Sequence, residues 1–223
     1  MSLLSPLVNW IKRQNPKFAF LHSHFGDRPF VLLDIGAGNS SASKTTNLFP
    51  QCTYYGLDLH KDYNNNNSDF VCMKGFFEMN LTKLEFDSIP NNFFDAILIV
   101  HVIEHLHNGT DVLKGMLPKL KPGGVLYVEY PGPRSLKLPH MKGSLNFNDD
   151  PTHVRLYSVR ELKVVFEEVG ATVLKGGTRR SWFYVFATPA RIILRMLRGK
   201  PVTGNVFWDL LGFAEYVEVR SGK

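Results

Sequence analysis

The sequence has few cysteines and no long apolar run. Cys52 and Cys72 are the only two cysteines among 223 residues, too few for a disulfide framework. Both fall at or near predicted buried strands, so we expect reduced packing residues. No stretch reaches about 18 uninterrupted apolar residues, which argues against a membrane span. Residues 1–13 lack the basic start and continuous apolar core of a signal peptide, and we therefore expect a cytoplasmic protein.

Acidic residues are missing from one long stretch, Val169–Trp208, in a chain of net charge +6. Its basic residues are Lys175, Arg179, Arg180, Arg191, Arg195, Arg198 and Lys200, and they are interleaved with aromatic and aliphatic residues. Such a surface suits anionic lipid, a phosphorylated or nucleotide-linked sugar, or RNA. The simpler alternative is a solvated basic face on a helix whose apolar side packs on the core. No RNA-recognition motif accompanies the charge, so we expect no nucleic acid and keep peripheral membrane contact through residues 175–200 as a possibility.

The segment Phe30–Ser40, FVLLDIGAGNS, organises the rest of the chain. An apolar run ends in Asp34 and enters a turn with Gly36 and Gly38, which predicts a buried parallel strand, a ligand-binding loop and a helix. The third glycine of a dinucleotide fingerprint is missing, because Ser41 stands in its place. Asp34 would repel a pyrophosphate but attract an ammonium or a sulfonium. This combination disfavours a nicotinamide-dependent oxidoreductase.

The D-x-G-x-G run from Asp34 to Gly38 resembles motif I of the class I S-adenosylmethionine-dependent methyltransferases. The ligand of that family carries an ammonium and a sulfonium and no phosphate. The resemblance implies that Asp34, Gly36 and Gly38 hold the methionine part of S-adenosylmethionine.

Two positions later in the chain extend the predicted cofactor site with side chains that can accept hydrogen bonds. Asp58 ends a second predicted strand, Thr53–Leu59, about twenty residues after the glycines, where an acid can bind the ribose hydroxyls. In the family, an aspartate usually contacts the adenine amino group. This chain offers Asn80, followed by Leu81, or alternatively Glu78.

Further motifs follow in the order of the same family. A strongly apolar strand, Phe93–Val102, precedes IEHLHN, a helix, the sequence KPGG and another strand. A helix capped by Ser158 and ended by Gly170 then leads to a sixth strand. The resemblance covers Pro29–Leu174 and is to the broad small-molecule and glycan branch of the family.

This resemblance implies an α/β fold, a Rossmann-like seven-stranded sheet with helices on both faces and an antiparallel last strand. We expect a single domain over residues 1–223. Its parts are an N-terminal helical extension (1–28), the Rossmann-like core (29–181), a helical insertion between strands six and seven that caps the substrate mouth (182–212), and the last strand (213–223). Locally, we predict a helix at Leu3–Gln14, a flexible loop at Tyr63–Ser68 and a third strand at Phe70–Lys74.

Catalysis of methyl transfer needs a base only when the acceptor must lose a proton. His101, His105, His140 and His153 are predicted to converge above the central strands. We assign His153 as the candidate base, oriented by Asp149 or Asp150, and place His101 beside the sulfonium or acceptor. For His105, next to Glu104, a structural hydrogen bond is the favoured role.

A metal site is an alternative for the same residues. His101, Glu104, His105 and His153 resemble the ligands that hold a divalent metal in small-RNA 2′-O-methyltransferases, with histidine at the first position instead of glutamate. Three imidazoles and one carboxylate would suit zinc or another transition metal. Together with the earlier motifs, the resemblance implies an O-methyltransferase acting on a small, anionic molecule or glycan intermediate. An RNA 2′-O-methyltransferase and a non-catalytic scaffold of the same fold are the alternatives.

Overall fold

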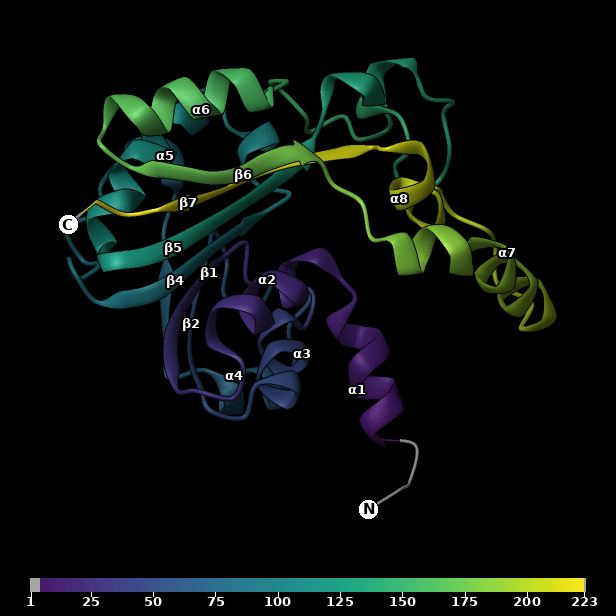
Figure 1. Ribbon diagram of the computed structural model, residues 1–223, viewed down its shortest axis with the longest axis horizontal. Coiled ribbons are helices and arrows are strands. Elements are labelled where there is room, and N and C mark those ends of the chain that lie inside the picture. Colours follow the sequence, from purple (N-terminus) through teal and green to yellow (C-terminus); the bar gives the residue numbers. More distant parts are fainter. Residues whose placement is uncertain (1–4, 223) are drawn as a thin grey trace.

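A seven-stranded sheet forms the centre of the molecule, as the computed structural model of residues 5–222 shows (Figure 1). Its strand order is β3-β2-β1-β4-β5-β7-β6, and β7 runs antiparallel to both of its neighbours. The strands are β1 (Phe30–Ile35), β2 (Cys52–Asp58), β3 (Gly75–Glu78), β4 (Phe94–Val100), β5 (Leu120–Pro131), β6 (Thr172–Thr178) and β7 (Ala214–Arg220). The predicted fold class is confirmed, including the last strand.

Helices cover both faces of this sheet. They are α1 (Ser5–Arg13), α2 (Pro16–Phe25), α3 (Ser41–Leu48), α4 (Asn67–Cys72), α5 (Gly109–Met116), α6 (Val159–Glu168), α7 (Trp182–Leu197) and α8 (Trp208–Leu211). Successive residues of a strand point to opposite faces. Leu32 therefore packs in the cluster that includes α2 and α3, whereas Leu33 packs in the cluster that includes α5 and α6. Ser158 caps α6 as predicted, its hydroxyl accepting from the Glu161 amide at 3.2 Å.

The N-terminal region contains two helices, where the sequence suggested one at Leu3–Gln14. Leu3 and Leu4 lie outside the described residues. Asn15 starts the second helix, α2: its side chain accepts from the Lys17 amide at 3.2 Å, and Pro16 occupies the first helical position. Proline is well tolerated there because its missing N–H would lack a helical partner anyway. This second helix packs on the sheet and reaches the end of β1.

The third strand was predicted wrongly at Phe70–Lys74. That segment mostly forms α4, and β3 begins at Gly75. A capping box explains the difference: the Asn66 side chain accepts from the amide of Ser68, and the buried Asp69 carboxylate accepts from the Asn66 amide at 2.9 Å. This cap starts a helix in a segment whose apolar residues alone suggest a strand.

The asparagine run lies mostly on the surface, as predicted, and makes hydrogen bonds to neighbouring segments. Asn65 donates to the carbonyls of Ala37 and Lys61, at 3.1 and 3.0 Å, and accepts from the Ser40 amide at 3.2 Å. Asn64 donates to the Asn39 side chain at 2.9 Å. The loop therefore braces the glycine turn after β1, and its polar composition serves hydrogen bonds within the chain.

Helices α7 and α8 form an insertion between β6 and β7, and α7 extends away from the sheet (Figure 1). The two arginines of α7 bind backbone carbonyls of the protein, so they do not form a solvated basic face. Arg191 donates to the Val206 carbonyl at 3.2 Å, and Arg195 donates to the Pro201 carbonyl at 2.8 Å. The opposite, apolar side of α7 faces solvent, which disagrees with the simpler alternative of an apolar side packed on the core. Within residues 5–222, no helix has the length and apolar character needed to cross a bilayer.

Candidate functional site

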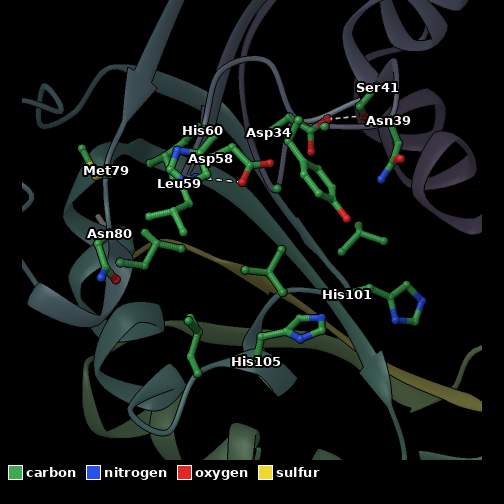
Figure 2. A pocket seen from close by; sticks show the side chains of 18 of the residues that line it. Asp34, Asn39, Ser41, Asp58, Leu59, His60, Met79, Asn80, His101 and His105 are labelled. Carbon is green, nitrogen blue, oxygen red and sulfur yellow. Dashed lines mark hydrogen bonds between the residues drawn. The ribbon is translucent and has the colours of Figure 1, made fainter. Parts of the chain in front are cut away.

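A cavity of about 810 Å³ lies at the carboxyl ends of β1, β2 and β4. Figure 2 shows its walls: Asp34 and Ser41 near one another, Asp58, Leu59 and His60 from the end of β2, Asn80 opposite, and His101 and His105 beyond β4. Ligand sites in parallel α/β sheets form at this edge, and the volume falls within the usual range for small ligands. The structure thus brings all the predicted cofactor residues to one cavity.

Asp34 lies buried at the end of β1. Its Oδ2 accepts hydrogen bonds from the Ser41 hydroxyl at 2.5 Å and from the Tyr54 hydroxyl at 2.8 Å. Burial, and then the negative charge of Asp34, raise the pKa of Tyr54 well above its ordinary value, so Tyr54 remains a donor. Lys17 of α2 also reaches this end and donates to the Ser41 hydroxyl at 3.0 Å. A carboxylate and an ammonium therefore lie close together here.

The glycine turn offers few free amides to a ligand. The amides of Gly36 and Ala37 donate to the Leu57 carbonyl at 2.8 and 3.1 Å, and the Asn39 amide donates to Tyr63 at 3.2 Å. Ser40 donates to Asn65, and Ser41 donates to Gly38 at 3.1 Å. Phosphate sites depend on free amides at a helix start. Since these amides are engaged within the chain, the turn suits a ligand without phosphate.

The two glycines are needed for close packing. Gly36 has a φ of +81°, and a Cβ there would lie 2.5 Å from Val102 Cγ2. A Cβ on Gly38 would lie 2.5 Å from the ring of Tyr63. The turn can therefore stay against the cavity only with glycine at both positions.

Asp58 ends β2, the strand next to β1, and so lies near Asp34, whereas Asn80 lies farther along the cavity (Figure 2). Asp58 accepts from the Leu59 amide at 2.7 Å, and desolvation raises the pKa of its carboxyl. The Asn80 oxygen caps η1 (Leu81–Lys83) by accepting from the Thr82 amide at 3.0 Å and the Thr82 hydroxyl at 2.7 Å. Glu78 instead accepts from the Lys61 amide at 3.2 Å and does not line the cavity.

His101 follows β4 with a positive φ of 55° and lies between two buried carboxylates. Its Nδ1 is 3.1 Å from Glu104 Oε1, and its Nε2 is 3.2 Å from Glu129 Oε1. Burial alone would lower the pKa of His101, but the two carboxylates outweigh it and raise the pKa to about 9. An imidazolium has no lone pair. In this charged state His101 does not fit its predicted role as a metal ligand, whereas its predicted place beside the cofactor site agrees with its position in the cavity wall.

A buried ionic network continues from His101. Arg179, at the end of β6, has Nε 3.3 Å from Glu129 Oε1 and Nη1 2.8 Å from Asp209 Oδ2. Burial alone would raise the pKa of Glu129, but Arg179 and His101 lower it to about 2. The ring of Trp208 lies over His101 at 4.8 Å. The network therefore joins β4, β5 and β6 to α8 beside the cavity.

This pairing predicts a pH-dependent stability. Because the folded pKa of His101, about 9, exceeds the ordinary 6.5, its contribution is complete below pH 6.5 and is lost as the pH rises through 9. It amounts to at most about 3 kcal/mol. Urea unfolding from pH 6 to 9.5 should show the free energy of unfolding of the wild type falling toward that of His101→Gln. Parallel curves for the two proteins would contradict the assignment.

His105 and His153 lie together beyond β4, with ring centroids 4.9 Å apart. His105 lines the cavity, whereas His153 is outside its wall with a side chain only 6% exposed. The Nδ1 of His153 is 2.6 Å from the Phe147 carbonyl, and the Nδ1 of His105 is 3.2 Å from the Thr152 carbonyl. His105 Nδ1 is also 2.9 Å from the Thr152 hydroxyl, whose own proton is donated to Asp150. A carbonyl only accepts, so each neutral ring carries its proton on Nδ1 and its lone pair on Nε2.

The remaining predicted histidine does not reach the cavity. His140 is exposed and pairs with Asp149, Nδ1 to Oδ1, at 2.7 Å. Asp149 therefore does not orient His153, and Asp150 lies 3.9 Å from His153 Nε2. Of the four histidines expected to converge, His101 and His105 line the cavity, His153 packs against His105 outside the wall, and His140 lies away from it.

The sequence reasoning missed several residues in the wall of the cavity, among them Lys17, Asn39, Tyr63 and Met79. Asn39 and Tyr63 flank motifs that were identified, so their proximity could have been inferred from the short loops. Lys17 comes from a helix that precedes the sheet, and its position depends on how α2 packs, for which the sequence gives no local signal.

Comparison with known proteins agrees with this geometry. The family model described as "Methyltransferase domain" matches residues 10–175. A Haloferax volcanii methyltransferase solved with its Trm112 activator superposes with a TM-score of 0.63 at 14% identity, over 95% of this chain and 91% of that one. An S-adenosylmethionine-dependent methyltransferase from Archaeoglobus fulgidus gives a TM-score of 0.57 at 18% identity, over 95% and 93%.

A third solved structure contains the cofactor. The Haemonchus contortus phosphoethanolamine N-methyltransferase 2, in complex with S-adenosyl-L-methionine, gives a TM-score of 0.64 at 16% identity, over 94% of this chain and 53% of that one. No curated protein sequence matches significantly. Identities this low show a shared fold alone. The family assignment rests on the family model, which spans most of the chain. The chain therefore belongs to the methyltransferase domain family and is an S-adenosylmethionine-dependent methyltransferase.

Proposed function

We propose that this methyltransferase methylates a hydroxyl oxygen of a small-molecule or glycan acceptor, with His105 as the general base. The observation that carries the proposal is the shared cavity, which has Asp34, Asp58 and Asn80 on its walls and His105, with its lone pair on Nε2, beyond β4. A base is required for a hydroxyl acceptor, which must lose a proton as it attacks.

Three parts of the cavity fit three parts of S-adenosylmethionine. Asp34 and Lys17 supply opposite charges for the ammonium and carboxylate of the methionine part, beside Gly36 and Gly38. Asp58 can accept from the ribose hydroxyls. Asn80 and the backbone of Leu81, which line the same cavity, can contact the adenine ring. The engaged amides of the glycine turn support this ligand over a nucleotide with phosphates.

The chemistry then depends on alignment and proton removal. S-adenosylmethionine supplies a methyl group that is already activated for displacement. The chain aligns the reacting atoms, which can lower the barrier by up to about 7–11 kcal/mol in favourable cases. His105 accepts the acceptor's proton on Nε2 while Thr152 holds its Nδ1–H. His101, held in place by its two buried carboxylates, forms part of the wall of the site.

Small-molecule relatives support the acceptor class. The solved structures of similar fold include a phosphoethanolamine N-methyltransferase and a sarcosine dimethylglycine methyltransferase from Galdieria sulphuraria. The proposal of an anionic acceptor has lost support, because Arg191 and Arg195 bind carbonyls of their own chain.

Release of S-adenosylhomocysteine in the presence of matched hydroxyl and amine compounds tests the choice of oxygen over nitrogen. Turnover with the amines alone would overturn it.

Replacement of Asp58 by asparagine should weaken cofactor binding about 10–100-fold. Hydrogen bonds to a charged group contribute about 1.5–3 kcal/mol, and the carboxylate is the acceptor here. Because its pKa is raised, wild-type affinity should also fall as the pH drops toward the acid range, and Asp58→Asn should lack this dependence. Calorimetric titration with S-adenosylhomocysteine measures both effects. Asp62→Asn, at an exposed position four residues away, is the control.

A metal-dependent mechanism is a second candidate, and one observation favours it. Glu104, His105 and His153 place one ligand atom each within 4.8 Å of one another. Glu104 is buried, and its Oε2 has no hydrogen-bond partner within the described residues. Two histidines and a carboxylate form a known ligand set.

Titration with Zn²⁺ and Mn²⁺ separates the two candidates. A stoichiometric metal signal that disappears in His153→Ala, together with loss of turnover after chelation, would favour the metal. Turnover that is unchanged by a chelator and by added metal would leave His105 as the base. His153→Ala is informative because His153 lies outside the cavity wall and touches the acceptor in neither mechanism.

A further inference from the structure

An exposed apolar face runs along the whole length of α7. Trp182, Phe186, Pro189, Ala190, Ile193, Met196 and Leu197 recur at the spacing of one helical face and are all exposed. Phe186 is 79% exposed and Leu197 is 78% exposed. No charged residue belongs to this set. Leaving so much apolar surface in water is unfavourable, and patches of this kind usually mark an interaction site.

The first helix adds to this surface. The ring of Trp10 in α1 packs edge-on against Phe183 of α7 at 5.3 Å, and Tyr184 donates to the Ile11 carbonyl at 3.3 Å. Leu7, Val8 and Trp10 are themselves 43–55% exposed. Both helices lie at the end of the molecule away from the C-terminus (Figure 1). Two segments about 170 residues apart in sequence thus present apolar side chains together.

The charges around this surface are of one sign. Residues 1–26 and 169–208 contain no aspartate or glutamate. Lys12 in α1 and Arg198 and Lys200 after α7 are exposed. The guanidinium of Arg180 lies 5.8 Å from the Trp182 ring. An apolar face with tryptophan, phenylalanine and leucine, flanked by cations without acids, is complementary to the surface of an anionic bilayer.

We propose that α7 and α1 dock this enzyme on anionic lipid bilayers, with the apolar face of α7 lying in the headgroup region. The helix has 16 residues and is not suited to cross the bilayer. It lies parallel to the membrane surface, with Arg191 and Arg195 bound to the chain behind it. This function is independent of the proposed acceptor and base.

Flotation of the full chain with vesicles tests the proposal. The wild type should bind vesicles containing phosphatidylglycerol, bind more weakly to phosphatidylcholine alone, and lose part of its binding at high salt. Phe186→Ser with Leu197→Ser should lower the partition coefficient about 10-fold or more. Lys12→Glu with Lys200→Glu should weaken binding to the anionic vesicles alone.

The control is Val71→Ser on α4, where an equally apolar side chain is 87% exposed outside the proposed surface. Calorimetric binding of S-adenosylhomocysteine by each variant verifies that it is folded. Failure of the wild type to bind any vesicle would overturn the proposal. So would a concentration-dependent dimer in analytical ultracentrifugation that the Phe186/Leu197 variant abolishes, since the face would then be covered by a second copy of the chain.

Discussion

Replacement of His105 by asparagine lowers kcat about 10²–10⁴-fold, the range for loss of a general base, and leaves the affinity for S-adenosylhomocysteine within about twofold. Asparagine keeps a donor where Nδ1–H meets the Thr152 carbonyl and removes the Nε2 lone pair. Initial rates measured at varied acceptor concentration separate kcat from KM in the wild type and the variant. The measurement therefore distinguishes a base from a residue that only shapes the cavity.

The control for this experiment is His107→Asn. His107 is exposed two residues further along the same loop and does not line the cavity. A loss of less than about threefold in His105→Asn would rule out the proposed base. Equal losses of turnover and cofactor affinity would indicate that His105 maintains the cavity instead.

Replacement of Arg179 by methionine destabilises the fold by about 3–5 kcal/mol, because Glu129 and Asp209 then remain buried without their cation. In a chain of this size the melting temperature should fall by about 6–20 °C. Thermal unfolding followed by circular dichroism measures the change. No other single substitution proposed for this protein is expected to destabilise it as much.

Arg180→Met is the matched control. Its guanidinium is partly exposed, and its contact with the Leu210 carbonyl is long, at 3.4 Å. The expected change is within about 0.5 kcal/mol, as for most surface substitutions. Similar destabilisation in both variants would contradict the importance of the buried network. A partial rescue of Arg179→Met by Asp209→Asn would support it, since that change removes one of the unpaired charges.

Strong local patterns predicted most of the fold. The apolar runs before Asp34 and Asp58 became parallel strands, and the alternation of AEYVEVR became β7 over Ala214–Arg220. The strand ends then placed Asp34, Asp58 and Asn80 around one cavity, because parallel strands end at the same edge of the sheet.

The failures involve contacts between distant segments. The carboxylates that hold His101 come from Glu104 and from Glu129 on a neighbouring strand, and their combined effect on its pKa cannot be read from spacing. The orientation of α7 stayed open because an amphipathic pattern identifies two faces but does not say which one meets the protein. The capping box at Asn66 was readable in the sequence and was outweighed by the apolar residues after it.

The most direct test of the cofactor site is a crystal structure of the protein with S-adenosylhomocysteine. We predict that both ribose hydroxyls contact Asp58, that the adenine lies at Asn80 and Leu81, and that the amino acid part lies between Asp34 and Lys17. The thioether sulfur should then face the side of the cavity formed by His101 and His105. Ligand bound elsewhere, or in this cavity with the ribose away from Asp58, would contradict the account.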